Sequence, residues 1–135
     1  MEINMTDQIK FTDLSKASSL EIARYAVSVL NERNAQNIKL LHVEEKTELT
    51  EYFIICEGNS STQVRALADE VEYKLGQSSL EKDSADRDVE HQWIVLDYGC
   101  VMIHIFYQQT RDFYNLEKLW ADAEEIDVSD IVYDK

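Results

Sequence analysis

Two apolar, β-rich runs at 93–97 and 100–107, joined through Tyr98 and Gly99, constrain this fold more than any other feature. Such runs separated by two turn residues predict a β-hairpin. The expected cross-strand pairs are Asp97 with Cys100, Val95 with Met102 and Trp93 with His104. An antiparallel hairpin excludes an all-parallel sheet.

Strand alternation divides this hairpin into two faces. We expect the aliphatic face in the core: Ile94, Leu96, Val101, Ile103 and Ile105. The other face is mixed: Trp93, Val95, Asp97, Cys100, Met102, His104 and Phe106. This mixture is typical of a protein-docking patch. On the residues alone, however, a face covered by helices is the favoured interpretation, because most hydrophobic sheet faces are covered. No nucleophile stands beside Asp97 and His104, so we expect no catalytic site there.

The rest of the chain alternates helices with strands, which predicts a single α/β domain. The expected elements are a helix at 19–33 with a capping box at Ser18 and Glu21, strands at 38–43 and 52–56, a helix after 58–61 that stops at Gly76, and a polar, mobile loop at 77–91. With the hairpin they predict a mixed sheet of four or five strands and flanking helices. We expect the chain to consist of three parts: a mobile leader (1–14), the domain (15–122) and an acidic tail (123–135).

The segment 110–120 is predicted to be one helix. Its apolar side is expected to pack inward: Phe113, Leu116, Leu119 and Trp120. Tyr114 and Lys118 are four residues apart on another side of that helix and stay available to a partner.

The turn at 58–61, Gly-Asn-Ser-Ser, precedes a helix and has two interpretations. It can cradle a phosphate, and it looks like the entry to the nucleotidyltransferase fold. Those enzymes need paired carboxylates for metal ions, and the next acidic pair, Asp69 and Glu70, lies in the helix body. Helix capping is therefore favoured, and we expect no metal and no cofactor. A nucleotide-binding enzyme remains the alternative.

Charge narrows the classes of partner. The chain has 27 acidic and 13 basic residues and a formal net charge of -14, which repels a phosphate backbone and disfavours direct nucleic-acid recognition. The same field would steer a basic protein, such as a ribosomal protein, although solubility alone also explains it. Cys56 and Cys100 are expected to be buried, reduced thiols. No apolar run reaches the roughly 20 residues of a membrane span and no signal peptide is evident, so we expect a cytoplasmic protein.

Three motifs carry a family resemblance. They are Trp93-Ile-Val-Leu-Asp-Tyr-Gly99 with His104 beyond it, Phe113-Tyr-Asn-Leu-Glu-Lys-Leu-Trp120, and Thr50-Glu-Tyr-Phe-Ile-Ile-Cys-Glu-Gly-Asn-Ser60 followed by Gln63-Val64 and 66–69. Over about 20–121 the chain resembles the ribosomal silencing factor family (RsfS, Iojap-like). It departs from the family pattern at Glu51 and Cys100, where Asp is usual, and at 84–92, where a Gly-x-Glu-Gly stretch is usual. The tail is expected to lie beyond the usual family end.

The resemblance implies a nucleotidyltransferase-like fold without catalytic carboxylates. It also implies a non-catalytic protein that binds the large ribosomal subunit through protein L-fourteen, blocks association with the small subunit and represses translation. A homodimer is possible. With the resemblance, the docking interpretation of the hairpin becomes the preferred one. The expected partner-binding residues are Trp93, Asp97, Tyr98, Met102, His104, Phe106, Tyr114 and Lys118.

Overall fold

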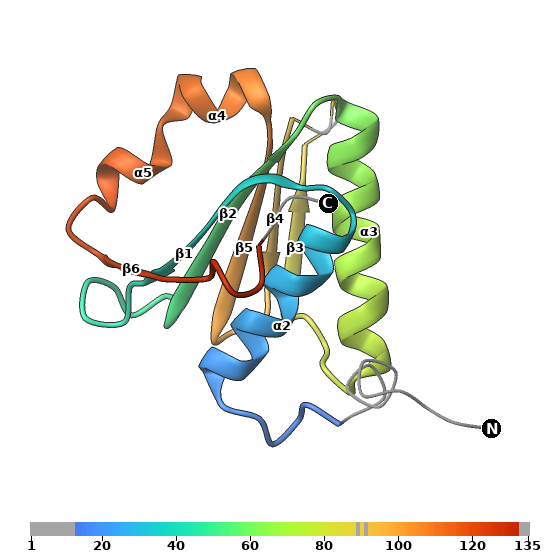
Figure 1. Cartoon of the computed structure of the whole chain (residues 1–135), viewed down its shortest axis with the longest axis vertical. Coiled ribbons are helices and arrows are strands. Elements are labelled where there is room, and N and C mark those ends of the chain that lie inside the picture. The colour runs from blue at the N-terminus through green and yellow to red at the C-terminus, as the bar shows by residue number, and fades with distance from the viewer. Residues whose placement is uncertain (1–12, 89, 91, 133–135) are drawn as a thin grey trace.

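The computed structural model describes residues 13–88, 90 and 92–132. Its elements are α2 (Ser19–Glu32), β1 (Gln36–His42), β2 (Tyr52–Gly58), α3 (Ser61–Gln77), β3 (Ser84–Arg87), β4 (Trp93–Asp97), β5 (Val101–Tyr107), α4 (Gln108–Tyr114), α5 (Leu116–Leu119) and β6 (Glu124–Ile126). The strands form one mixed sheet in the order β3-β4-β5-β2-β1-β6 (Figure 1). β2 and β5 pair in parallel, and the other described pairs are antiparallel. The α/β prediction is confirmed, but six strands replace four or five.

α2 and α3 cover one face of the sheet (Figure 1). The Ser18 side chain caps α2 by accepting from the Glu21 N–H, as the capping box predicts. α3 presents a buried stripe to the sheet: Val64, Leu67, Ala68, Val71 and Leu75. The aliphatic face of the hairpin lies beneath these helices, each of its side chains at most 1% exposed. The stop at Gly76 is wrong, because α3 runs to Gln77 and the left-handed residue is Ser79.

The predicted hairpin forms, but its turn is longer than expected. Asp97 pairs with Met102, and the connection between β4 and β5 spans residues 98–100 instead of two residues. Gly99 supplies a φ of +80° within it, and its N–H donates to Asp97 Oδ1 at 2.8 Å. The register moves by two residues, so alternation still assigns the strand residues to the predicted faces. Cys100 is the exception, because it lies in the turn and packs against the core beneath the helices.

The two additional strands lie in segments expected to be irregular. β3 falls within the predicted polar loop and pairs with β4 at one edge of the sheet. β6 falls within the predicted tail and pairs with β1 at the other edge. Beyond β6, Val128 is buried, and the Asn31 side chain donates to the Ile131 carbonyl at 3.1 Å. The packed structure therefore continues past the expected boundary at residue 122.

The predicted leader lies outside the described residues except for Asp13 and Leu14. Leu14 is buried, and its N–H donates to the Ser78 carbonyl at 2.9 Å. Leu14 therefore packs with the domain, one residue before the boundary expected at residue 15.

The second sheet face is only partly covered. The chain crosses it as α4 and α5, which are separated by Asn115 at φ +47° (Figure 1). This break corrects the single helix predicted at 110–120. Leu116 and Trp120 pack on the sheet as expected. Phe113 is 81% and Leu119 is 78% exposed, because the chain turns at Asn115 between α4 and α5. One edge of this face, over β3 and β4, is left accessible.

Candidate docking site

Three aromatic rings form a stack where β4, β5 and α4 meet. The register places Trp93 opposite Phe106, and their ring centroids are 4.9 Å apart and nearly parallel, at 25°. Tyr114 of α4 contacts Trp93 with a centroid separation of 4.9 Å, and its ring is tilted by 44° from the Trp93 ring. Phe106 has no exposed surface, Trp93 is half-buried and Tyr114 is 53% exposed. The stack therefore runs from the core to solvent and holds the Trp93 ring in one orientation.

His104 holds Trp93 from a second direction. The Trp93 Nε1–H donates to His104 Nδ1 at 3.2 Å, which requires the unprotonated Nδ1 and places the ring proton on Nε2. Burial lowers the pKa of His104 to about 4, so the ring is neutral near pH 7. Asp97 does not contact this ring, because it lies opposite Met102 and binds the turn. The arrangement therefore positions Trp93 and does not pair a histidine with a carboxylate.

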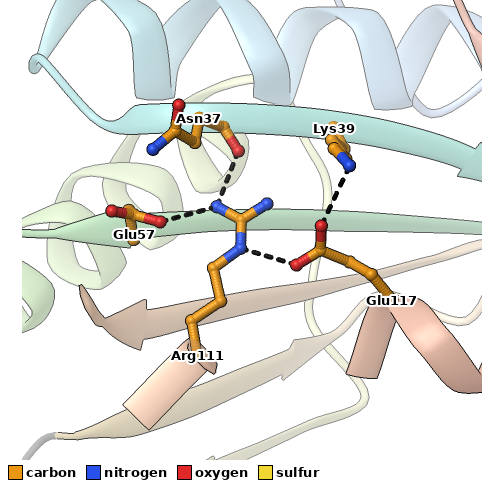
Figure 2. A network of polar contacts seen from close by, with 5 residues as sticks. All are labelled: Asn37, Lys39, Glu57, Arg111 and Glu117. Atoms are coloured by element: carbon orange, nitrogen blue, oxygen red, sulfur yellow. Dashed lines mark hydrogen bonds and ion pairs between the residues drawn. The ribbon is translucent and has the colours of Figure 1, made fainter. Parts of the chain in front are cut away.

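A buried ionic network attaches α4 and α5 to the sheet (Figure 2). The guanidinium of Arg111, 6% exposed, donates through Nη1 to Glu57 Oε1 at 3.0 Å and to the Asn37 carbonyl at 2.7 Å. Its Nε donates to Glu117 Oε1 at 2.7 Å, and Glu117 Oε2 meets Lys39 Nζ at 3.0 Å. The hydrogen bond from Arg111 is the main cause that holds the pKa of Glu117 below its usual value. The network thus fixes α4 to β2 and α5 to β1.

The fold places the predicted site residues at different depths and on both faces of the sheet. Trp93 and Met102 are half-buried on the partly covered face, and Tyr114 and Lys118 are exposed beside it. Phe106 and His104 are buried beneath that surface, where both lie against Trp93. Tyr98 packs against the core on the opposite side of the sheet, where burial raises the pKa of its hydroxyl.

Sequence reasoning missed the residues that hold the site together. Glu57 alternates onto the partly covered face at the end of an otherwise apolar strand, and a charge there needs a buried partner. The sequence therefore indicates that Glu57 has a buried partner, but it does not identify that partner as Arg111, which lies 54 residues away in sequence. Trp120 was expected to pack inward, but its partner, Phe53 at a centroid distance of 5.0 Å, was not.

The turn at 58–61 is explained by capping. Ser60 Oγ accepts from the Gln63 N–H at 3.1 Å, and Gln63 Oε1 accepts from the Asn59 N–H at 2.6 Å. These reciprocal bonds occupy donors that a phosphate would use. Over the described ranges no three His, Cys, Asp or Glu side chains are grouped as a metal ion would require. Within the same ranges no helix has the length and apolarity needed to cross a membrane.

The comparisons agree with the resemblance found in the motifs. A family model described as "Ribosomal silencing factor during starvation" matches residues 16–135. This match includes the tail, which corrects the expectation that it lies beyond the family end. The Bacillus subtilis protein named "Ribosomal silencing factor RsfS" is 34% identical over 107 residues, covering 79% of this chain and 91% of that protein.

Two further comparisons concern structure and a more distant relative. A crystal structure of a Chromobacterium violaceum protein aligns with a TM-score of 0.75 and 29% identity, covering 77% of this chain and 87% of that one. The mouse protein named "Mitochondrial assembly of ribosomal large subunit protein 1" is 32% identical over 101 residues, covering 70% of this chain and 43% of its own length.

Proposed function

Because the chain belongs to the ribosomal silencing factor (RsfS) family, we propose that it binds the large ribosomal subunit through protein L-fourteen, without catalysing a reaction. We further propose that the bound protein blocks the small subunit and so represses translation. The observation that carries the proposal is the stack of Tyr114, Trp93 and Phe106, which ends in exposed aromatic surface at the partly covered sheet face.

The chemistry of this surface supports protein docking. The residues available to a partner are Trp93, Val95, Met102, Phe113, Tyr114 and Lys118. Tryptophan and tyrosine are enriched among the residues that dominate binding energy. Trp93 is held by Phe106, Tyr114 and His104, so little side-chain freedom is lost on association. A prearranged aromatic anchor is what a specific protein interface requires.

The charge of the chain supports a basic partner. A net charge of -14 speeds association with a positively charged protein surface and opposes contact with ribosomal RNA. We therefore expect binding through a ribosomal protein. Its association rate should fall as salt is raised, while the apolar contacts around Trp93 should hold the complex.

Co-sedimentation with purified large subunits tests the binding step. Wild-type protein should co-sediment at moderate salt. Trp93→Ala and Tyr114→Ala should each weaken binding by about 2 kcal/mol, roughly thirtyfold, because each removes an aromatic anchor. Tyr73→Ala is the matched control, since Tyr73 is 60% exposed on α3, away from the site. Unchanged affinity for both site variants with folded protein would place the interface elsewhere.

Subunit joining tests the blocking step separately. Light scattering should show less joining of the two subunits when the wild-type protein is present, and Trp93→Ala should restore it. Binding without any effect on joining would retain the partner and reject the anti-association role. Calorimetry with nucleoside triphosphates and Mg²⁺ addresses the nucleotide-binding alternative, for which we expect no binding heat because Ser60 and Gln63 cap α3 themselves.

A further inference from the structure

A small cavity lies at the edge of the aromatic stack. Its volume is about 210 Å³, and its walls include Trp93, Val95, Tyr114, Asp86 and Asp88. Strand pairing explains the composition, because Asp86 lies opposite Val95 and so shares a sheet face with Trp93. The cavity is smaller than the usual pocket for a drug-sized ligand, and it suits a single side chain.

The charges around this cavity lack a cationic partner. Neither Asp86 nor Asp88 forms an ion pair with any residue that the structure describes, and no basic side chain lines the cavity. Asp88 uses Oδ1 to accept the Gln92 N–H at 2.7 Å, which holds its carboxylate at the rim. The neighbouring cation, Arg87, is engaged by Asp69 and Glu72 of α3 instead.

We propose that this cavity is a socket for one arginine side chain of the docking partner. The inference rests on the proposed function and specifies the chemistry by which that site recognises its partner. A guanidinium lies flat on an aromatic ring and donates two parallel hydrogen bonds to a carboxylate. Tyr114, which is 53% exposed, supplies the ring face, Trp93 lines the same cavity beside it, and Asp86 and Asp88 supply the carboxylates. A lysine ammonium lacks the planar, bidentate geometry, so arginine is the preferred guest.

The first experiment examines the socket without the ribosome. Acetyl-arginine amide is titrated into the full chain while the Trp93 indole N–H is followed by NMR, with Trp120→Phe used to assign the two indole signals. A saturable shift of the Trp93 signal is expected. It should weaken at least severalfold in Asp86→Asn/Asp88→Asn, which keeps an oxygen acceptor at position 88. An equal response to acetyl-lysine amide or acetyl-norleucine amide, or no response at all, would overturn the assignment.

The second experiment asks whether docking uses the socket. Asp86→Asn/Asp88→Asn should bind purified large subunits at least about tenfold more weakly than wild type, as expected for loss of close charge pairs. Glu32→Gln/Glu81→Gln removes the same charge from exposed positions outside the cavity and should bind like wild type. If wild type does not bind large subunits, the proposed function is rejected. The NMR titration then still shows whether the cavity binds an arginine side chain. Normal binding by the aspartate variant rejects the use of the socket and leaves the proposed function standing.

Discussion

Replacing Arg111 with methionine should destabilise the fold more than any surface change considered above. The substitution keeps an unbranched, apolar side chain at this position and removes the cation that faces Glu57, whose side chain is 5% exposed. Glu57 Oε2 already has no hydrogen-bond partner among the described residues. The variant therefore leaves a carboxylate buried with neither its counter-ion nor its hydrogen bond.

The expected loss follows from the burial of the pair. Removing one member of a buried ion pair costs roughly 3 to 5 kcal/mol, a large part of a total stability of roughly 5 to 15 kcal/mol. Arg111→Met/Glu57→Met removes both charges and should recover most of that loss, because a buried pair is close to neutral against apolar residues of similar volume. Lys39→Met should cost under about 1 kcal/mol, since Lys39 lies at the 40% exposed end of the network.

Urea unfolding of wild type, Arg111→Met, Glu57→Met, the double variant and Lys39→Met measures these differences directly. The double-mutant cycle should give a coupling energy of about 3 kcal/mol between positions 57 and 111. Arg111→Met should also weaken binding to large subunits, because it frees α4 and moves Tyr114 from Trp93. A single-variant loss below about 1 kcal/mol, or a double variant as unstable as the single one, would refute the argument.

Three further changes test other parts of the site. The pKa of His104 is 6.5 in the unfolded chain and about 4 in the folded protein, so the unfolded chain binds a proton first as the pH falls. Wild type should therefore lose about 2 kcal/mol of stability between about pH 7 and pH 5. In urea unfolding, His104→Gln should lack this dependence on pH. Asn115→Gly should keep the melting temperature, whereas Asn115→Val should lower stability by roughly 1 to 2 kcal/mol at φ +47°. Ser60→Ala should cost about 1 kcal/mol and Ser60→Asp almost nothing in the same assay; equal losses would contradict capping.

The two faces of the hairpin were predicted correctly although the length of its turn was predicted wrongly. The observed register differs from the predicted one by two residues, and an even shift leaves each strand residue on the same face. The aliphatic core face was therefore predictable, while the turn was not, because Asp97 and Gly99 stabilise a longer connection through a side-chain hydrogen bond. The edge strands were hidden for another reason. β3 is Ser-Ala-Asp-Arg, and only pairing with β4 makes that polar sequence a strand.

Which side chains are exposed on the partly covered face depends on the path of the chain after β5, and helical periodicity alone does not give that path. A continuous helix at 110–120 would bury Phe113 together with Trp120. The left-handed residue Asn115 instead ends α4, and Arg111 and Glu117 then fasten the two short helices to different strands. Phe113 turns outward as a result, while Phe106 is sealed beneath Trp93. The exposure of Phe113 therefore depends on the backbone angle of Asn115, which the local sequence pattern leaves undetermined.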